Sequence, residues 1–330
     1  MAVKDTILGM LKVHQDDWTS GEALSLQLKI SRAAVWKHIA KLRQDGYEIE
    51  ASTRKGYQLK SAPSLLLPAE IKDGLKTSIW GKRDMVYHPE TASTNTDAKI
   101  LATQGAPEGT VVIAEHQTRG RGRLGRDWYS PHSRGIYISV IIRPRFSLQD
   151  APILTPLTAV VMAEALTEET GLEVLLKWPN DIVVSGRKIG GILTEIGSEM
   201  DQIDFAVIGL GLNVRRCRFP EDLKSKATSI EEETSRRVSR AGLVRSYLGK
   251  FETVYEQKKT WGFGPLLKRY EALTAVVGKE VTVNSGGRRL SGRVRDLDEH
   301  GALIVEGGGG TTIRVVSGDV HYSFNGVADQ

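Results

Sequence analysis

The stretch Gly120-Arg121-Gly122-Arg123-Leu124-Gly125-Arg126-Asp127-Trp128 carries three glycines and three arginines in its first seven positions, and Arg119 precedes it. Glycine has no Cβ, so its backbone can approach a ligand closely and adopt positive φ. Arginine presents a planar fork of donors that matches carboxylate and phosphate oxygens. These residue types predict a cationic loop that closes over an anion. A solvated basic loop without a ligand is the alternative.

The three glycines of this loop also fit the Gly-x-Gly-x-x-Gly pattern of dinucleotide-binding turns. That fold requires a strand before the glycines and a helix directly after them. The β-branched run 110–114 predicts the strand. Residues 127–135, however, end in turn-forming residues and do not begin a helix. The sequence therefore disfavours a dinucleotide-binding fold.

Length and composition set broader limits. A chain of 330 residues predicts two or three domains, and a formal net charge of +5 permits an anionic partner without requiring nucleic acid. The single cysteine, Cys217, excludes an intramolecular disulfide and a cysteine-rich zinc site. We see no signal peptide and no run of about 20 apolar residues that could span a membrane. These features predict a soluble, cytoplasmic protein.

Residues 1–62 form a predicted winged helix-turn-helix domain. Apolar residues recur at helical spacing from Val3, and serines at positions 20 and 31 are placed to cap a second and a third helix. Two strands, over 47–50 and 56–59, flank a polar tip that we interpret as a wing.

The same domain is basic, since positions 29 to 60 hold eight Lys or Arg and three acids. The third helix turns polar and aromatic residues away from its apolar face, where a recognition helix would contact DNA. We predict DNA contacts by Ser31, Arg32, Trp36 and Lys37. A helical domain that binds only protein, with a solvated basic face, is the alternative.

Two further domains complete a multidomain α+β chain. Residues 65–273 alternate strands, such as 135–142 and 205–211, with helices, such as 155–170, which predicts a mixed α/β domain. Residues 276–325 contain short strands separated by glycines, which predict a small β-barrel.

Five motifs occur in order along the central domain: Ser93-Thr94-Asn95, Glu115-His116-Gln117 leading into the arginine loop, KWPND (177–181), KIGGILTE (188–195) and GLGLN (209–213). In this series the chain resembles the bifunctional bacterial biotin protein ligases, which also act as biotin operon repressors. The resemblance covers nearly the whole chain, and it implies a central ligase domain and a C-terminal SH3-like barrel. At Leu124 the loop departs from relatives that carry arginine there.

The resemblance implies an activity in two steps. Biotin and ATP, the substrates, give biotinyl-5′-adenylate and pyrophosphate, and a lysine of a biotin carboxyl carrier protein then takes the biotinyl group. Because a carboxylate and a triphosphate repel each other, such a site needs fixed positive charge. We expect Arg121, Arg123 and Lys177 to supply it as catalytic residues. An ordinary surface lysine before a turn is the alternative for Lys177.

The resemblance also assigns ligand contacts. Biotin is expected to contact Ser93, Thr94, Asn95, Gln117, Arg121, Gly122, Arg123 and Lys177. The adenylate is expected to contact Arg123, Arg126, Trp128, Asn180, Lys188 and Asn213. Ser-Thr-Asn alone would more often cap a helix, and the tryptophan and asparagines could be packing or turn residues. Mg²⁺ is expected, although nothing local fixes its ligands beyond a possible role for Asp181 and Glu195.

Expected partners are the carrier protein, operator DNA and a second copy of the chain when biotinyl-5′-adenylate is bound. Two other functions stay open. A biotin-sensing transcription regulator without catalysis would have no need to handle pyrophosphate. A lipoate-protein ligase would lack the Gly-Arg-Gly-Arg loop and normally the DNA-binding domain.

Overall fold

The computed structural model describes residues 3–14, 17–199, 202–274, 276–285 and 287–322. Positions 323–325 of the predicted third domain therefore lie outside the described residues. The chain divides into two compact units, Met1–Leu65 and Leu66–Gln330. Among the described helices, none combines the length and the apolar character that a membrane crossing requires.

The first unit is a winged helix, as predicted. Helices α1 (Val3–Val13), α2 (Gly21–Leu28) and α3 (Arg32–Gln44) precede a hairpin of β1 (Glu48–Ser52) and β2 (Gly56–Ser61). Ser20 Oγ accepts from Ala23 N at 2.9 Å and Ser31 Oγ from Ala34 N at 3.2 Å, so both serines cap their helices. The core of the unit consists of buried side chains from all three helices: Ile7, Leu8, Leu11, Leu24, Val35, Ile39 and Leu42.

The second unit is built on a seven-stranded sheet with the order β3-β4-β5-β9-β8-β7-β6. The strands are β3 (Met85–His88), β4 (Val111–Ala114), β5 (Gly135–Ile142), β6 (Leu175–Lys177), β7 (Asp181–Val184), β8 (Arg187–Glu199) and β9 (Gln202–Asn213). β3 and β4 are parallel, and the other neighbours are antiparallel. A doubly wound dinucleotide-binding sheet is parallel, so this topology agrees with the sequence argument against that fold.

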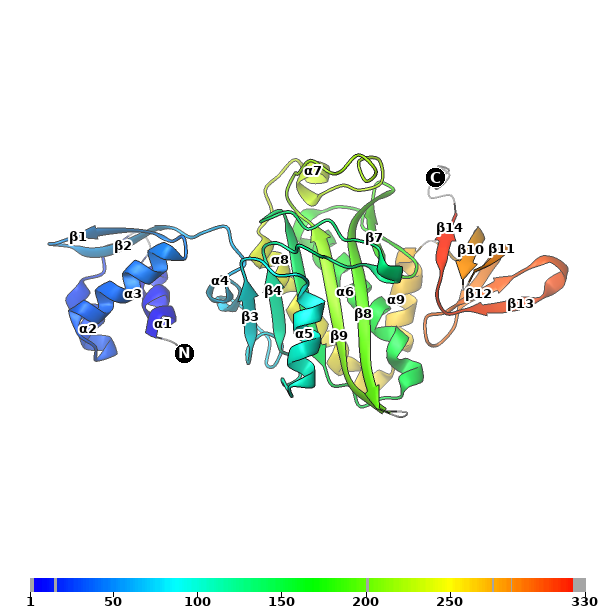
Figure 1. The fold of residues 1–330 in the computed structure, drawn as a ribbon, viewed down its shortest axis with the longest axis horizontal. Helices are drawn as coiled ribbons and strands as arrows, with labels where there is room; N and C mark the ends of the chain where they lie inside the picture. The colour runs from blue at the N-terminus through cyan, green and yellow to red at the C-terminus, as the bar shows by residue number, and fades with distance from the viewer. Residues whose placement is uncertain (1–2, 15–16, 200–201, 275, 286, 323–330) are drawn as a thin grey trace. The chain divides into compact units, whose positions relative to one another are not determined.

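Helices cover both faces of the sheet (Figure 1). On one face, α5 (Thr94–Thr103) packs Ala98 and Ala102 against Val112, Ile141 and Val207. The neighbours of Val112 point the other way, as alternation in a strand requires, into the main core. That core includes side chains of α4 (Pro68–Lys72), α6 (Leu154–Thr170), α8 (Arg240–Trp261) and α9 (Gly264–Thr274).

The C-terminal residues of this unit form a five-stranded antiparallel sheet with the order β13-β12-β11-β10-β14. Its strands are β10 (Glu280–Ser285), β11 (Arg288–Leu297), β12 (Leu303–Glu306), β13 (Thr312–Val315) and β14 (Asp319–His321). The edge strands β13 and β14 do not pair within the described residues, so the predicted SH3-like barrel is an open sheet here. Its buried valines join the main core, and Trp178 Nε1 donates to Gly301 O at 3.0 Å.

A buried carboxylate fixes the end of β4. Glu115 is fully buried, accepts from Leu66 N at 2.5 Å and from Ser133 Oγ at 2.8 Å, and pairs with Arg240 Nη1 at 2.9 Å. Arg240 Nη1 also donates to Gly135 O at 2.9 Å. Paired and hydrogen-bonded in this way, the charge is tolerated in the core. It ties together the start of the unit, the start of α8 and the segment that leads into the arginine loop.

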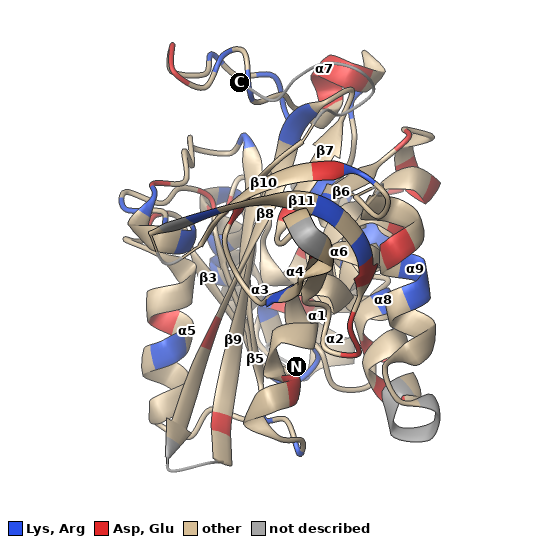
Figure 2. Ribbon diagram, turned by 90° about the vertical axis from the view of Figure 1, so that its right-hand side faces the viewer, with Lys and Arg blue, Asp and Glu red and all other residues tan. Residues whose placement is uncertain are grey.

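A second anchor holds the turn between β7 and β8. The short helix α7 (Ile230–Thr234) carries three glutamates and is the acidic segment at the top of Figure 2. Its Glu233 Oε1 accepts from Arg187 Nη2 and from Thr228 Oγ1, both at 2.7 Å. This contact fixes the start of β8, beside Lys188.

Candidate functional site

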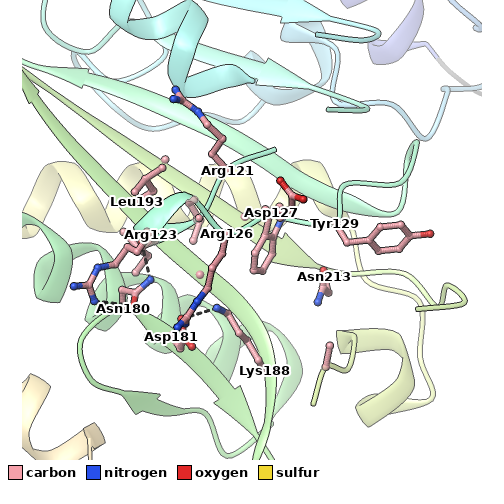
Figure 3. Close-up of a pocket in the computed structure, with 18 of the residues that line it drawn as sticks. Arg121, Arg123, Arg126, Asp127, Tyr129, Asn180, Asp181, Lys188, Leu193 and Asn213 are labelled. Atoms are coloured by element: carbon pink, nitrogen blue, oxygen red, sulfur yellow. Dashed lines mark hydrogen bonds and ion pairs between the residues drawn. The ribbon is translucent and has the colours of Figure 1, made fainter. Parts of the chain in front are cut away.

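A cavity of about 400 Å³ lies at one end of the seven-stranded sheet and is lined by the predicted ligand-binding residues of the central domain (Figure 3). They come from the start of α5, the loop after β4, the β6–β7 turn, the start of β8 and the end of β9. The set comprises Ser93, Thr94, Asn95, Gln117, Arg121, Gly122, Arg123, Arg126, Trp128, Lys177, Asn180, Lys188 and Asn213. Their distribution over more than a hundred positions makes this convergence a property of the fold. Which ligand each residue contacts stays a prediction.

One end of the cavity is neutral and polar. Gln117 Oε1 accepts from Thr94 N at 2.9 Å and from Thr94 Oγ1 at 3.2 Å, and Gln117 Nε2 donates to Ser130 Oγ at 3.0 Å. Ser139 Oγ bonds Asn95 Oδ1 at 2.6 Å. Ser93 occupies the N-cap position of α5 but makes no side-chain capping bond. The side chains of the Ser-Thr-Asn motif therefore do not serve as a helix cap here, and all three are buried in the polar wall of the cavity.

The arginine loop is a tight excursion without a following helix, as predicted. Gly122 N donates to Arg126 O at 2.7 Å, and Trp128 N donates to Gly120 O at 2.9 Å. Between them, Arg123–Gly125 form a single 3₁₀ turn in which Leu124 has φ 56°. A left-handed leucine is unusual, and its side chain is exposed. The loop thus lines the cavity with Gly122 and with its arginines.

The loop arginines differ in their partners. Arg123 Nη1 donates to Asn180 Oδ1 at 3.3 Å. Arg121 Nη2 donates to Thr96 Oγ1 at 2.9 Å and lies 3.8 Å from Glu195 Oε2. Figure 3 shows the Arg121 side chain directed away from Arg123. The two arginines predicted to supply positive charge to the reacting carboxylate and phosphate therefore point apart in this structure, although both line the cavity.

Electrostatics distinguish Arg123 further. Burial lowers the pKa of its guanidinium, and the negative charges of Asp319 and Asp181 oppose that effect. A half-buried cation with a neutral amide partner is poorly solvated. An anionic ligand would therefore be attracted to it more strongly than to an exposed arginine.

The opposite wall comes from KWPND and KIGGILTE. Lys177 ends β6 and pairs in register with Asp181 on β7. Asn180 Nδ2 donates to Ile192 O at 3.0 Å, which fixes the turn between these strands. Lys188 Nζ lies 2.7 Å from Asp181 Oδ1 and 5.3 Å from the centre of the Trp128 ring. Lys177 and Lys188 thus both lie close to Asp181.

The Trp128 ring occupies space that two glycines leave free. A Cβ on Gly211 would lie 2.4 Å from Trp128 Cε2, and a Cβ on Gly191 would lie 3.1 Å from Trp128 Cζ3. At the other end of the cavity, a Cβ on Gly209 would lie 2.1 Å from Asn95 Oδ1. The glycines of KIGGILTE and GLGLN are therefore required by the site as well as by the strands. Beside them, Asn213 Nδ2 donates to Thr228 O at 3.1 Å.

The carboxylates considered for magnesium are already engaged. Asp181 pairs with Lys188, and Glu195 accepts from Lys99 Nζ and Asn95 Nδ2, both at 2.9 Å. No group of three or more His, Cys, Asp or Glu that could hold a metal occurs among the described residues. The side chains of the described residues therefore do not fit a resident metal centre.

The structure adds lining residues that the motifs did not predict. Three of them, Asp319, Val320 and His321, come from β14 of the C-terminal sheet, and others follow β9 in the chain. Among the latter, Phe219 packs against Tyr129 with ring centres 6.3 Å apart. Of these residues, only the aromatic pair could have been suspected from the residue types in the local sequence. Nothing near Asp319 indicates its place in the cavity.

The predicted DNA-binding residues lie together on the first unit. Ser31, Arg32, Trp36 and Lys37 are exposed on one side of α3, and 59% of the Trp36 surface is accessible. The wing tip exposes Arg54 and Lys55, and Lys55 Nζ lies 5.7 Å from the centre of the Trp18 ring. A large exposed aromatic with flanking cations fits a surface that meets another molecule. Contact with DNA stays a prediction for these residues.

Three family patterns match the chain. Residues 87–213 match the Biotin/lipoate A/B protein ligase family, residues 4–58 match the HTH domain, and residues 276–321 match the Biotin protein ligase C terminal domain. These ranges include the cavity motifs, most of the winged helix and all five strands of the C-terminal sheet.

Whole-chain relatives agree with these matches. The bifunctional ligase/repressor BirA of Bacillus subtilis is 40% identical over 88% of this chain and 90% of its own length. BirA of Escherichia coli is 31% identical over 88% of each protein. Among solved structures, the biotin protein ligase from Aquifex aeolicus in complex with biotin and ATP superposes with a TM-score of 0.63 at 28% identity, covering 73% of this chain and 99% of that one.

Proposed function

We propose, from the premise that this chain belongs to the family of bifunctional biotin protein ligases and repressors, that it biotinylates a carrier protein and regulates transcription in response to biotin. The observation that carries the ligase activity is one cavity in which a neutral polar wall faces a cationic loop. Such a cavity suits a neutral ring with a carboxylate tail beside a nucleotide.

In the first step the biotin carboxylate attacks the α-phosphorus of ATP. A carboxyl oxygen–phosphorus bond forms, the bond from that phosphorus to the bridging oxygen breaks, and pyrophosphate leaves with its electrons. Arg121, Arg123 and Lys177 bring positive charge to the reacting oxygens, and Gly122 lets the backbone approach. Fixed cations in a closed site stabilise charge that develops in the transition state.

In the second step the uncharged amine of a carrier lysine attacks the acyl carbon of the adenylate. A carbon–nitrogen bond forms, the bond from carbon to the AMP oxygen breaks, and the amine proton passes to solvent. We assign no general base, since Asp181 is paired with Lys188 and Asp319 with Arg126. The loop instead holds the adenylate and excludes water until the lysine arrives.

We divide the ligand contacts as the motifs suggest. Ser93, Thr94, Asn95 and Gln117 bind the ureido ring of biotin, and Arg126, Trp128, Asn180, Lys188 and Asn213 bind the adenylate. The buried hydrogen-bond network of the polar wall and the Lys188–Trp128 contact support this division. Because the carboxylates are engaged, we propose that Mg²⁺ enters with the triphosphate, whose oxygens and waters supply most of its ligands.

A two-stage assay tests the ligase activity. Purified chain with biotin and ATP should release pyrophosphate, and a biotin carboxyl carrier domain added afterwards should become biotinylated on lysine. A sensor without catalysis would bind biotin and release no pyrophosphate. A lipoate ligase would release it with lipoate and not with biotin. Either result would sink the proposal.

For repression we propose operator DNA as the partner of the first unit and a homodimer of the adenylate-bound form. The free edge of β8 supports the dimer. β7 pairs with β8 only as far as Gly191, and Ile192 N donates to Asn180 O just beyond. Along the rest of the described part of β8, no strand pairs with the edge that faces away from β9. An uncovered strand edge is a template for pairing with another chain. Sedimentation with and without biotin plus ATP tests it, and identical masses would remove the coupling.

We also retain the three sequence domains, 1–62, 65–273 and 276–325, as units of function. The family matches fall within these bounds, while the second and third share one packed core.

A further inference from the structure

We propose that Asp319 of β14 is a positioning residue for the arginine loop. Its carboxylate holds Arg126 in the ligand-free protein and releases it to the nucleotide. The inference rests on the ligase function proposed above. It makes the C-terminal sheet a direct competitor of ATP for one loop cation.

The contact itself joins residues 193 positions apart, since Arg126 Nη2 meets Asp319 Oδ2 in a direct ion pair. The Arg126 side chain is 65% exposed and that of Asp319 is 32% exposed. The pair is thus open to solvent and weak enough for a polyphosphate to displace. Both residues line the same cavity.

The two partners differ in how firmly they are held. β14 pairs with β10 through Asn284↔Asp319 and Val283↔Val320, and both valines are buried. Asp319 therefore sits on a fixed strand. Arg126 follows a 3₁₀ turn whose residues Leu124 and Gly125 are exposed. The acid is consequently the anchor, and the loop is the part that moves.

The charge of Asp319 also reaches a second loop residue. Arg123 lies near enough that Asp319 is the strongest influence opposing the effect of burial on its guanidinium. Across the cavity, Lys188 is paired with Asp181 and Arg121 lies beside Glu195. Each of these cations has a carboxylate nearby before a ligand arrives. Asp319 differs from the other carboxylates because it comes from the C-terminal sheet.

The expected behaviour follows from this exchange. Without ligand, Asp319 restrains the loop. When ATP binds, its phosphates take Arg126 and the restraint is replaced by the ligand. Removing the charge of Asp319 therefore loosens the empty loop and removes a competitor of ATP.

The test compares the full chain with Asp319→Asn and with the control Asp296→Asn, an exposed acid on β11 outside the cavity. Trypsin, which cleaves after arginine, should cut the loop of Asp319→Asn faster than that of wild type or control without ligand. With biotin and ATP, all three should be equally protected. Unchanged melting temperatures show that the fold is intact, and Asp319→Ser provides the same comparison where the asparagine variant unfolds early.

A kinetic measurement accompanies the cleavage. The KM for ATP of Asp319→Asn should fall about two- to five-fold at low salt while kcat holds, as expected for loss of a partly exposed ion pair. The difference should narrow as salt rises, because screening weakens the pair in wild type. Equal cleavage of the empty loop, or a KM that stays or rises, overturns the inference. Failure of the ligase proposal looks different, since wild type would then show no protection and no pyrophosphate.

Discussion

Gly211 and Trp128 occupy space that only a glycine can share, because a Cβ at position 211 would lie 2.4 Å from the indole Cε2. Gly211→Ala is therefore expected to displace the ring and lower the free energy of unfolding by about 1–3 kcal/mol, as overpacking does. Nucleotide affinity should fall with it. Gly249→Ala is the control, since no atom lies within 4 Å of its added Cβ. Thermal unfolding and ATP titration check both variants, and equal behaviour would contradict the assignment.

Arg123→Ala removes the half-buried cation that faces Asn180. We expect adenylate formation to slow by about 100-fold or more, the scale on which one pre-organised group stabilises a transition state. Single-turnover pyrophosphate release measures it. Arg289→Ala, an exposed arginine outside the cavity, should leave the rate unchanged. Full turnover in Arg123→Ala would refute its role.

The Glu115–Arg240 pair is buried on both sides, with 0% and 3% of the residues accessible. Arg240→Ala leaves the carboxylate buried without its cation, so we expect a loss of about 3–5 kcal/mol in unfolding free energy. Lys250→Ala breaks the more exposed pair with Glu168 and should cost about 1 kcal/mol or less. Denaturant unfolding compares the two. Similar losses of unfolding free energy in the two variants would show that burial does not determine the cost of breaking an ion pair here.

The carboxyl group of Glu195 makes the free energy of unfolding depend on pH in the acidic range. Burial raises the pKa of its carboxyl, but the hydrogen bonds from Lys99 and Asn95 and the positive charges of Lys99 and Arg121 together outweigh burial, so the pKa lies below the ordinary 4.5. A depressed pKa stabilises the fold above the unfolded value, and that contribution is lost as pH falls through the folded value. Unfolding free energy should therefore drop more steeply below about pH 4.5 in wild type than in Glu195→Gln. Parallel curves would argue against the shift.

Lys37 is expected to contact DNA phosphate. Lys37→Ala should weaken binding of random-sequence duplex DNA and reduce the slope of log affinity against log salt by about one. Fluorescence anisotropy over a salt series measures this slope. Lys268→Ala, an exposed lysine of the second unit, is the matched control. Biotin-dependent pyrophosphate release should be unchanged in both.

Local chemistry made much of this fold predictable. Ser31 caps its helix as expected, and Gly171, with φ 73°, ends the helix that begins at Leu154. The strand 135–142 was predicted with the bounds of β5. Each of these signals lies within a few residues of the structure it specifies.

The rest depends on contacts between distant segments. Sequence motifs identified Arg121 as a cavity residue but not its bond to Thr96, since a loop side chain finds its partner only once α5 is in place. The same reason hid Asp319, whose position in the cavity depends on a separate sheet. The short elements β3 and β14 carry little periodicity and were not predicted.

The hydrogen bond from Leu66 N to Glu115 Oε1 fixes the first residue of the second unit. The chain that leaves the winged helix is clamped at Leu66 by the same carboxylate that ends β4, two residues before Gln117. The tether between the units and the base of the arginine loop thus share one fixed point. The segment between the end of β2 at Ser61 and Leu66 therefore leads directly into that fixed point. The length of the segment between the two units can therefore change without altering the base of the arginine loop.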